Sequence, residues 1–407
     1  MTWGKKILVT VGLLVVGAIV ISAIAFSYSS GCIGAPAVPE GVATMRATTY
    51  RCYGPPAVLT LETMAKSSPA DDQVLVQVHA AGVNPLDWHY LRGEPYLMRA
   101  SSGLGAPTDI RMGVDFAGTV AAVGKSVTQF RVGDEVFGGA SGAFGEYVTV
   151  RESRALTIKP ANVSFEQAAA VPIAAITALQ ALRDKGELKP GQKVLINGAS
   201  GGVGTFAVQI AKALGAEVTG VCSTRNVELV RSLGADFVVD YTREDFTRAD
   251  KRYDVIIDNV GSHGLLAYRR ALQPNGILVL VGSNSRGKWL GPLIRPLQAF
   301  VLAPFIGQHL RPLLAEMQPA DLAVIAAWME QGVVRSVIDR RYSLAEVPEA
   351  IEYLETGRVR GKLVITVLRE SSALALDENA GSGATQASRL SSRSSASERR
   401  TTSSSTT

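Results

Sequence analysis

The sequence predicts an α/β protein that combines a doubly wound parallel sheet with a β-rich domain and carries a transmembrane helix at its N-terminus. Three observations predict this fold class. A buried strand, a glycine-rich turn and a helix follow one another around residue 200, short strand-like segments fill residues 46–150, and an uncharged apolar run occupies Ile7–Phe26.

The composition is that of a well-packed chain with two domains. At 407 residues the protein exceeds what one hydrophobic core normally serves. Hydrophobic residues make up 47% and charged residues 19%, which excludes a wholly disordered chain and leaves room for a membrane segment. The net charge of +5 is modest, and the lysines and arginines are scattered. We therefore expect no nucleic-acid partner.

Residues that could bind a metal or form disulfides are few and dispersed. Cys32, Cys52 and Cys222 stand far apart and show no paired spacing typical of a disulfide framework or a structural metal site. None of the four histidines pairs with another at helical spacing. The sequence therefore predicts no metal site, and it favours reducing surroundings.

The first 30 residues resemble a membrane anchor. Lys5 and Lys6 precede Ile7–Phe26, which would span about 30 Å as a helix and cross a bilayer core. A cleaved signal peptide is the alternative, but the apolar run is longer than usual and no clean small-x-small site precedes Gly31. Lipidation of Cys32 is a minor alternative, because Ser29 stands where an aliphatic residue is expected.

Two arguments about the side of the membrane conflict. Lys5 and Lys6 favour an N-terminus on the inside, which would put the rest of the chain outside. A nucleotide coenzyme instead favours a cytoplasmic body, and Arg46 and Arg51 beyond the span weaken the charge bias. On chemical grounds we expect the body of the protein in the cytoplasm.

The C-terminal segment differs sharply in composition from the rest. From Ser371 to Thr407 the chain consists mainly of serine, threonine and small residues. Such a segment cannot bury enough apolar surface to offset the entropy lost on ordering. It is predicted to be a disordered tail.

A phosphate-binding turn is the strongest local signal. The apolar run Lys193–Asn197 reads as a buried strand, and Thr205–Leu214 reads as a helix. Between them stand Gly198, Ala199, Ser200, Gly201, Gly202, Val203 and Gly204. Strand, glycine turn and helix thus occur in the order that dinucleotide binding requires.

The glycines have separate roles in such a turn. Gly201 and Gly202 let backbone amides approach a pyrophosphate, and Gly204 lets the helix lie close to the strand. Ala199 replaces the first glycine of the usual pattern. Glycine-rich turns also serve as simple bends, so the motif gains its weight from its position between strand and helix.

The end of the next strand predicts the coenzyme. After Glu217–Val221, an NAD-specific site would place an acid on the ribose hydroxyls. This chain instead has Ser223, Thr224 and Arg225, which suit a 2′-phosphate through hydrogen bonds and charge. We therefore expect NADPH. The alternative is that Arg225 is an ordinary exposed residue at the start of a helix.

Further strands complete both domains. Phe237–Asp240, Tyr253–Asp258 and Gly276–Gly282 read as strands separated by helical stretches, as in a parallel sheet. Nearer the N-terminus, valines alternate with other residues in Gln73–His79, as expected for a half-buried strand. Many short segments between Arg46 and Val150 end at glycine turns.

Additional motifs stand in order along the chain: Ala81–Trp88, Gly113–Val120, Val132–Val136, Gly142–Tyr147, Gly234–Asp236, Asp240–Tyr241, Asp258–Gly261 and Arg360–Val364. Together with the glycine turn, they resemble the zinc-independent medium-chain dehydrogenases/reductases, namely the quinone oxidoreductase or zeta-crystallin group and its bacterial NADP-dependent relatives. The resemblance covers the chain from about Met45 to Leu368.

The resemblance implies a domain organisation. The expected parts are a membrane anchor (1–30), a GroES-like β-rich catalytic domain (45–166), a Rossmann NADP-binding domain (167–308), a C-terminal return to the catalytic domain (309–369) and the disordered tail (370–407). A homodimer through the nucleotide-domain sheet is also implied.

The resemblance implies chemistry without zinc. In zinc-containing relatives a cysteine stands near the position of Asn84, and a histidine and an acid take the place of Val114 and Asp115. The cysteine-rich lobe that holds their structural zinc is missing from this sequence as well. Hydride transfer to a quinone or an α,β-unsaturated carbonyl suits such a site, because the negative charge that gathers on the oxygen needs only hydrogen-bond donors.

By family position, Asn84 should lie beside the nicotinamide and donate to the substrate carbonyl or the coenzyme ribose. His89 or Tyr90 could then deliver a proton, and water is the alternative. His89 stands where the family pattern has a tyrosine. Asn-Pro is also a common turn pair, and Trp88 and Tyr90 could simply pack between the domains.

The resemblance also implies further coenzyme contacts. Thr177 is expected near the nicotinamide ribose, Tyr241 near the adenosine phosphate, and Lys362 near the diphosphate or 2′-phosphate, with a solvated surface charge as the alternative for Lys362. The remaining contacts are Asn259 and Val260 against the ribose and Gly282 and Ser283 near the carboxamide.

An apolar stretch from Trp289 to Met317 has two interpretations. It could cover the substrate pocket, or it could make a second membrane contact. Pro292, Pro296, Pro304 and Pro312 argue against a second spanning helix.

The sequence thus favours an NADPH-dependent reductase of quinones or enones. One alternative is a nucleotide-bound regulatory or structural protein that keeps the fold without turnover. The other is an alcohol or aldehyde dehydrogenase-type enzyme, for which bound zinc would be the sign.

Overall fold

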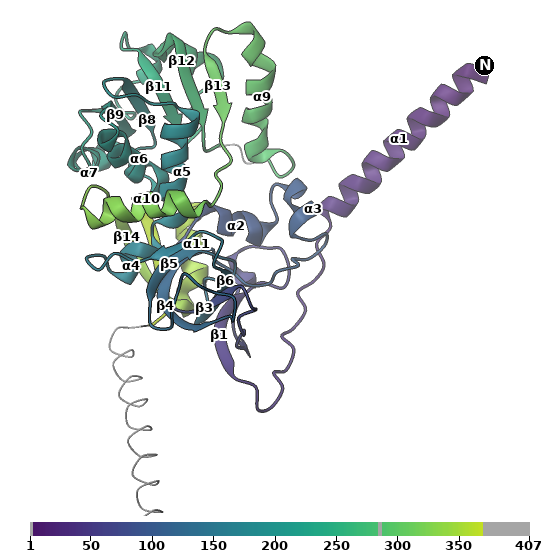
Figure 1. Cartoon of the computed structure of the whole chain (residues 1–407). Helices are drawn as coiled ribbons and strands as arrows, with labels where there is room; N and C mark the ends of the chain where they lie inside the picture. Colours follow the sequence, from purple (N-terminus) through teal and green to yellow (C-terminus); the bar gives the residue numbers. More distant parts are fainter. Residues whose placement is uncertain (1–2, 284–286, 369–407) are drawn as a thin grey trace, which may run out of the picture. The chain divides into compact units, whose positions relative to one another are not determined.

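Two sheets organise the protein, of which the computed structural model describes residues 3–283 and 287–368 (Figure 1). One sheet has six strands and the other has seven, and a two-stranded ribbon accompanies them. The tail expected in residues 370–407 lies outside the described residues.

Helices and strands alternate through the second half of the described chain. The helices are α1 (Trp3–Ser27), α2 (Pro85–Arg92), α3 (Arg99–Ser102), α4 (Phe165–Ala169), α5 (Pro172–Gln180), α6 (Gly202–Ala213), α7 (Val227–Ser232), α8 (Leu265–Ala271), α9 (Ile294–Leu302), α10 (Pro319–Glu330) and α11 (Val347–Glu355). The strands are β1 (Thr44–Thr49), β2 (Thr60–Ala65), β3 (Gln73–Val83), β4 (Asp115–Val123), β5 (Glu135–Gly139), β6 (Tyr147–Arg151), β7 (Leu156–Ile158), β8 (Lys193–Asn197), β9 (Glu217–Cys222), β10 (Phe237–Asp240), β11 (Tyr253–Asp258), β12 (Leu272–Leu280), β13 (His309–Pro312), β14 (Ile338–Ser343) and β15 (Lys362–Thr366).

The six-stranded sheet is the predicted doubly wound sheet. Its strands are all parallel, in the order β10-β9-β8-β11-β12-β13. The chain winds outward from β8 in one direction and then continues from β11 in the other. The carboxyl ends of β8 and β11 therefore flank a topological switch point, where sheets of this type bind their ligands.

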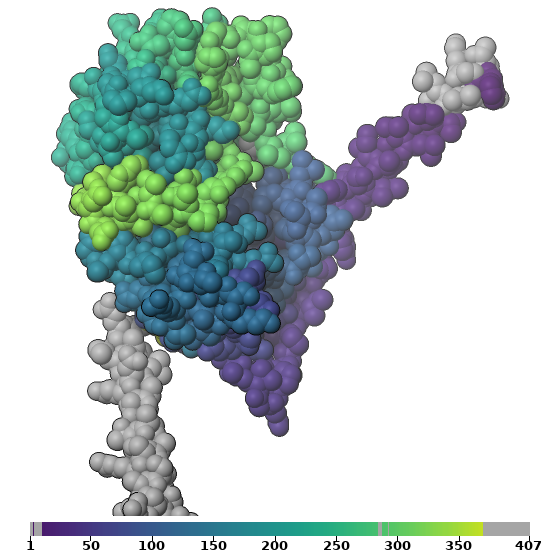
Figure 2. All heavy atoms as spheres, viewed as in Figure 1, coloured from purple at the N-terminus to yellow at the C-terminus, as the bar shows by residue number. Residues whose placement is uncertain are grey.

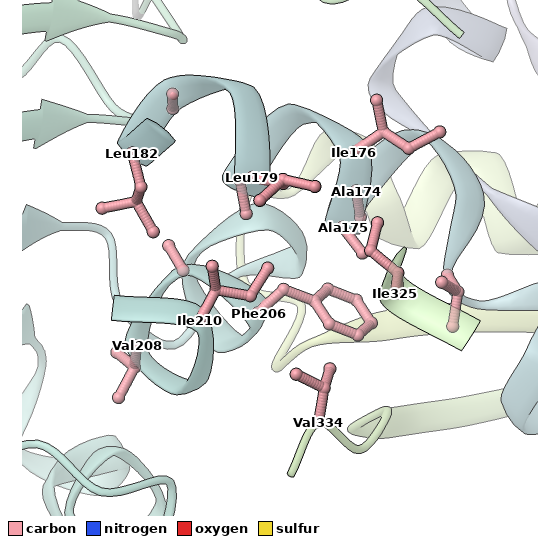
Figure 3. Packing of buried hydrophobic residues seen from close by; sticks show 14 of the residues in the cluster. Ala174, Ala175, Ile176, Leu179, Leu182, Phe206, Val208, Ile210, Ile325 and Val334 are labelled. Carbon is pink, nitrogen blue, oxygen red and sulfur yellow. The ribbon is translucent and has the colours of Figure 1, made fainter. Parts of the chain in front are cut away.

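Helices pack on both faces of this sheet because successive side chains of a strand point in opposite directions. Val194 and Ile196 of β8 join the core that contains α5 and α6, whereas Leu195 joins the core that contains α8 and part of α9. Figure 3 shows the first of these cores, in which Leu179 of α5 lies near Phe206 of α6. This packing fixes the N-terminus of α6 at the carboxyl end of β8.

The seven-stranded sheet is built from both ends of the chain. Its path is β14-β15-β3-β4-β5-β7, and β6 also pairs with β3. The C-terminal strand β15 runs antiparallel to β3, with Leu363 opposite Val83. This pairing brings Lys362, the first residue of β15, next to Asn84. The two-domain fold, GroES-like plus Rossmann, is confirmed.

The N-terminal apolar run forms the single helix α1. Its segment Thr10–Ser27 has a mean hydropathy of 2.4 and is not buried in the protein. By length and composition this helix could cross a membrane, and a signal sequence would have the same properties.

The cysteine prediction is wrong in one respect. Cys32 and Cys52 form a disulfide, with their Cα atoms 4.7 Å apart. Their linear spacing gave no sign of it, because the pair depends on the path of the segment after α1. That segment returns to the GroES-like domain, where the amide of Ser30 donates to the carbonyl of Gly105 over 2.8 Å. Cys222 is free and buried.

Candidate coenzyme and active site

A cavity of about 920 Å³ lies at the carboxyl ends of the Rossmann strands. Residues of both domains line it, among them Asn84 and Lys362 of one domain and the glycine turn of the other. Its size is within the range of small-molecule and cofactor sites. It coincides with the switch point between β8 and β11, where the fold alone predicts a dinucleotide.

The glycine turn after β8 has a backbone that side chains would block. Gly198 has a φ of +79°, in the left-handed region. A Cβ on Gly204 would lie 2.1 Å from the carbonyl oxygen of Gly198, so only glycine lets α6 start this close to β8. A Cβ on Gly201 would lie 3.4 Å from the carbonyl oxygen of Gly198, and the residues from Gly201 to Gly204 line the cavity, so the N-terminus of α6 faces it.

The alanine that replaces the first glycine of the motif is accommodated by a second glycine. Ala199 is fully buried, and a Cβ on Gly220 in β9 would lie 3.1 Å from the Cβ of Ala199. The missing side chain at residue 220 makes room for the methyl group of Ala199. The departure from the usual pattern therefore leaves the turn intact.

The residues from which NADPH was predicted follow directly after β9. Ser223, Thr224 and Arg225 all line the cavity. The hydroxyl of Thr224 donates to Asp240 Oδ2 over 2.5 Å, and it helps to hold the pKa of Asp240 below its usual value. Arg225 Nη2 donates to the carbonyl oxygen of Arg358 over 2.6 Å, so a second arginine stands beside it. Both arginines are among the residues that line this end of the cavity.

Two amide oxygens test whether the site fits a dinucleotide. Asn226 Oδ1 and Asn259 Oδ1 are buried and have no hydrogen-bond partner, and both residues line the cavity. Buried polar atoms are normally satisfied. Hydroxyl groups of the two riboses would satisfy them, so the residues present fit a dinucleotide coenzyme such as NADPH.

An ion pair supports the loop that carries Asn259. Asp258 at the end of β11 is fully buried, and its Oδ1 accepts from the amides of Val260 (3.2 Å) and Gly261 (2.9 Å). Its Oδ2 accepts from Arg295 Nη2 of α9 over 2.7 Å. The loop that carries Asn259 is thus held by the carboxylate of Asp258, whose negative charge is balanced by Arg295 of α9.

Four buried polar residues, of which Asn84 and Lys362 line the cavity, meet where β15 pairs with β3. Asn84 Nδ2 donates to Asp115 Oδ2 over 2.9 Å and to the carbonyl of Gly82 over 3.3 Å. Lys362 Nζ donates to Asn84 Oδ1 and lies 3.7 Å from Asp115 Oδ2. The amide of Asn84 donates to Asp87 Oδ2 over 2.7 Å. The side-chain amide of Asn84 is therefore held on both sides.

Burial dominates the ionisation of this cluster. It raises the pKa of Asp87 to about 7 and the pKa of Asp115 to about 6, and it lowers the pKa of Lys362. Lys362 pulls the pKa of Asp115 back down, as does the amide of Asn84. Asp115 also accepts from the amide of Ile173 over 3.2 Å, so we assign it the carboxylate form, paired with the ammonium of Lys362.

His89 and Tyr90 follow Asn84 on α2 but are not among the described residues that line the cavity. The ring of His89 stacks on Trp88, and its Nδ1 lies 2.6 Å from the carbonyl oxygen of Glu94. Because a carbonyl only accepts, Nδ1 carries the proton. Burial lowers the pKa of His89, so the ring is neutral and Nε2 has no proton to give.

The structure brings most of the expected coenzyme residues together. Those that line the cavity are Gly198, Ser200, Gly201, Gly202, Val203, Gly204, Ser223, Thr224, Arg225, Tyr241, Asn259, Val260 and Lys362. Other expected residues are not among the described lining: Thr177, Ala199, Gly282 and Ser283. Lys362 is only 3% exposed, so the alternative of a solvated surface charge is wrong.

Sequence reasoning missed several residues of the site. Asn226 and Arg358 line the cavity, whereas Asp258 and Arg295 support it from behind. Arg358 stands two residues before the Arg360–Val364 motif, and that short distance was the available signal. No signal in the sequence pairs Arg295 with Asp258.

Among residues 3–283 and 287–368, no three His, Cys, Asp or Glu side chains come close enough together to hold a metal ion. A GroES-like domain and a Rossmann domain that share a cavity with a phosphate-binding turn define the medium-chain dehydrogenase/reductase class. Models of two families match the chain: "alcohol dehydrogenase GroES-like domain" at residues 70–160 and "zinc-binding dehydrogenase" at residues 233–365.

Individual proteins narrow the class. The 2-methylene-furan-3-one reductase of Solanum lycopersicum is 34% identical over 336 residues, covering 79% of this chain and 79% of that protein. The quinone oxidoreductase structure from Coxiella burnetii is 32% identical with a TM-score of 0.71, covering 80% and 100% of the two chains. The Escherichia coli quinone oxidoreductase, solved in complex with NADPH, is 26% identical with a TM-score of 0.69, covering 79% and 100%. The chain belongs to the zinc-independent, quinone oxidoreductase-like group of this family.

Proposed function

We propose that this protein is an NADPH-dependent reductase of quinones or α,β-unsaturated carbonyl compounds. The observation that carries the proposal is the cavity, which is lined by the glycine turn at the start of α6, by Arg225 and Arg358, and by Asn226 and Asn259, whose side-chain oxygens have no partner. The names of the relatives support the substrate class, since they include quinone oxidoreductases and the reductase of a conjugated methylene ketone.

The coenzyme would supply the hydride, and the residues of the chain would position it. We assign the diphosphate to the amides around Gly202 and the 2′-phosphate to Ser223 and Arg225, with Arg358 adding positive charge. Asn259 and Asn226 would accept from ribose hydroxyls. Tyr241 and the remaining family-implied contacts, Thr177, Gly282 and Ser283, stay predictions.

Asn84 and Lys362 would form the floor of the cavity beside the nicotinamide. Both hydrogens of the Asn84 amide are engaged, so we assign Asn84 and Lys362 a positioning role together with Asp115. His89 directs its proton at Glu94 and not at the cavity. We therefore expect the proton that completes the reduction to come from water, which can enter the open cavity.

The proposal predicts steady NADPH oxidation with at least one acceptor in a panel of quinones and enones, and much slower oxidation of NADH. Spectrophotometric assay of the purified full chain in detergent measures both. Coenzyme binding without turnover for every acceptor would support the non-catalytic alternative. Turnover of simple alcohols together with stoichiometric zinc in metal analysis would support the alcohol dehydrogenase alternative.

We further propose that α1 anchors the protein in a membrane, with the body in the cytoplasm, where NADPH is available. The disulfide between Cys32 and Cys52 favours the opposite side, because disulfides form mainly in oxidising compartments, and a labelling experiment decides between the two sides. A membrane-impermeant maleimide added to intact cells should leave the exposed variant Val132→Cys unlabelled until the cells are lysed. Labelling before lysis would show that the body of the protein lies on the outer side of the membrane.

The homodimer that the resemblance implies stays a prediction. Strand β13 forms one edge of the six-stranded sheet, so its outer hydrogen-bonding groups are where a second copy would pair. Sedimentation of the full chain in detergent measures the oligomeric state.

A further inference from the structure

Helix α9 presents an apolar stripe on the outside of the nucleotide domain. Leu293, Leu297, Phe300 and Val301 recur at the spacing of one helix face and are 45%, 55%, 79% and 58% exposed. Phe305, just after the helix, is 79% exposed. The segment that contains them lies on the surface shown in Figure 2 (green). Exposed apolar residues in such a row mark an interaction site.

The opposite face of α9 is locked into the protein. Arg295 and Ala299 are buried, and Arg295 is paired with the fully buried Asp258. Arg295 Nη1 also donates to the carbonyl of His263 over 3.1 Å. Rotating the helix to hide its apolar stripe would break this buried ion pair, which is costly. The stripe therefore faces outward as a fixed feature of the fold.

The stripe is continuous with the end of α1 through a chain of contacts. Arg99 Nη1 donates to the carbonyls of Phe26 and Tyr28, over 3.1 and 2.8 Å, at the C-terminal end of α1. The guanidinium of Arg99 also lies over the ring of Tyr96, 4.5 Å from its centre. The ring of Tyr96 in turn packs edge-on against Trp289, with centres 5.2 Å apart.

Trp289 links this contact chain to α9. Its neighbour Lys288 accepts a backbone hydrogen bond from the amide of Tyr96 over 2.7 Å. Leu97 and Leu104, from the segment that also contacts the end of α1, are 43% and 58% exposed. Exposed apolar side chains therefore recur from Trp289 to Phe305, and Tyr96 joins Trp289 to the segment that contacts the end of α1.

The composition of this surface suits a lipid headgroup region. Residues 287–305 contain no aspartate or glutamate. Arg295 is buried against Asp258, so the exposed cation of this segment is Lys288, whose Nζ lies 3.6 Å from Glu94 Oε1. A tryptophan and a lysine at the edge of an apolar face are typical of segments that lie in the membrane interface. The contacts with α1 favour the membrane over an acidic partner protein as the occupant, because such a partner would have no reason to lie beside α1.

We propose that the exposed face of α9, with Trp289 at its edge, rests in the interface of the membrane that α1 enters. This inference rests on the proposed anchoring by α1. The nucleotide domain would then lie against the bilayer, instead of being connected to it only through α1.

Spin labels on the full chain in vesicles of phosphatidylcholine and phosphatidylglycerol test this. The labelled variants are Phe300→Cys on α9, Ile19→Cys on α1 and Val132→Cys as a control in the catalytic domain, where Val132 is 64% exposed. Cys222 is buried and the other cysteines are paired, so the introduced thiol takes the label. Labels at residues 300 and 19 should collide several-fold more often with oxygen than with a water-soluble nickel complex, and the label at 132 should show the reverse.

The three labels separate the possible failures. If residue 19 is lipid-exposed but residue 300 behaves like residue 132, the inference on α9 fails while the anchor stands. If residue 19 is water-exposed, the anchor itself fails. Strong spin–spin broadening at residue 300 would show instead that a second copy covers α9, and would also overturn the inference.

Discussion

Replacing Lys362 by methionine is expected to lower the free energy of unfolding by about 3–5 kcal/mol and to abolish turnover. Lys362 and Asp115 are both buried, at 3% and 0% exposure, and the ammonium balances the carboxylate. Methionine fills a similar volume but leaves the charge of Asp115 alone in the interior. Chemical denaturation of the full chain in detergent measures the stability, and NADPH oxidation measures the turnover.

The double variant Lys362→Met with Asp115→Asn separates charge balance from packing. Asparagine can still accept from the amide of Ile173, so removing both charges should recover most of the lost stability. Turnover should stay low, because Asn84 Oδ1 has then lost its donor. Equal instability of the single and double variants would contradict the assigned ion pair.

Replacing Arg225 by glutamine is expected to raise the KM for NADPH about 10- to 100-fold, the loss that one or two hydrogen bonds to a charged group would cause. The KM for NADH should stay almost unchanged, because NADH has no 2′-phosphate. Arg225 is exposed and lines the cavity, so its loss should not affect folding. Steady-state kinetics with both coenzymes measures the effect.

Arg243→Gln is the matched control for this prediction. Arg243 is an exposed arginine near the same end of the sheet, where it lies 3.5 Å from Asp240, but it is not among the described residues that line the cavity. Its replacement should leave the KM for both coenzymes unchanged. A similar loss for both variants would mean that only general positive charge matters, and a loss for NADH would contradict the assignment of Arg225 to the 2′-phosphate.

The sequence by itself determined the nucleotide half of the site. The turn from Gly198 to Gly204 and the residues from Ser223 to Arg225 each follow one strand directly, so their positions depend only on short local segments. The strand boundaries of β8, β10 and β11 agree with the prediction for the same reason, because each is a short apolar run between turns.

Only the tertiary structure decided the rest. Asn84 and Lys362 meet although 278 residues separate them, because β15 returns to pair with β3. The same holds for Arg295 with Asp258 and for Cys32 with Cys52, which no local pattern connects. A periodic pattern reports which face of a segment is apolar, but not which distant segment covers it. That is why the exposed face of α9, and the buried charge that keeps it turned outward, emerged only from the folded chain.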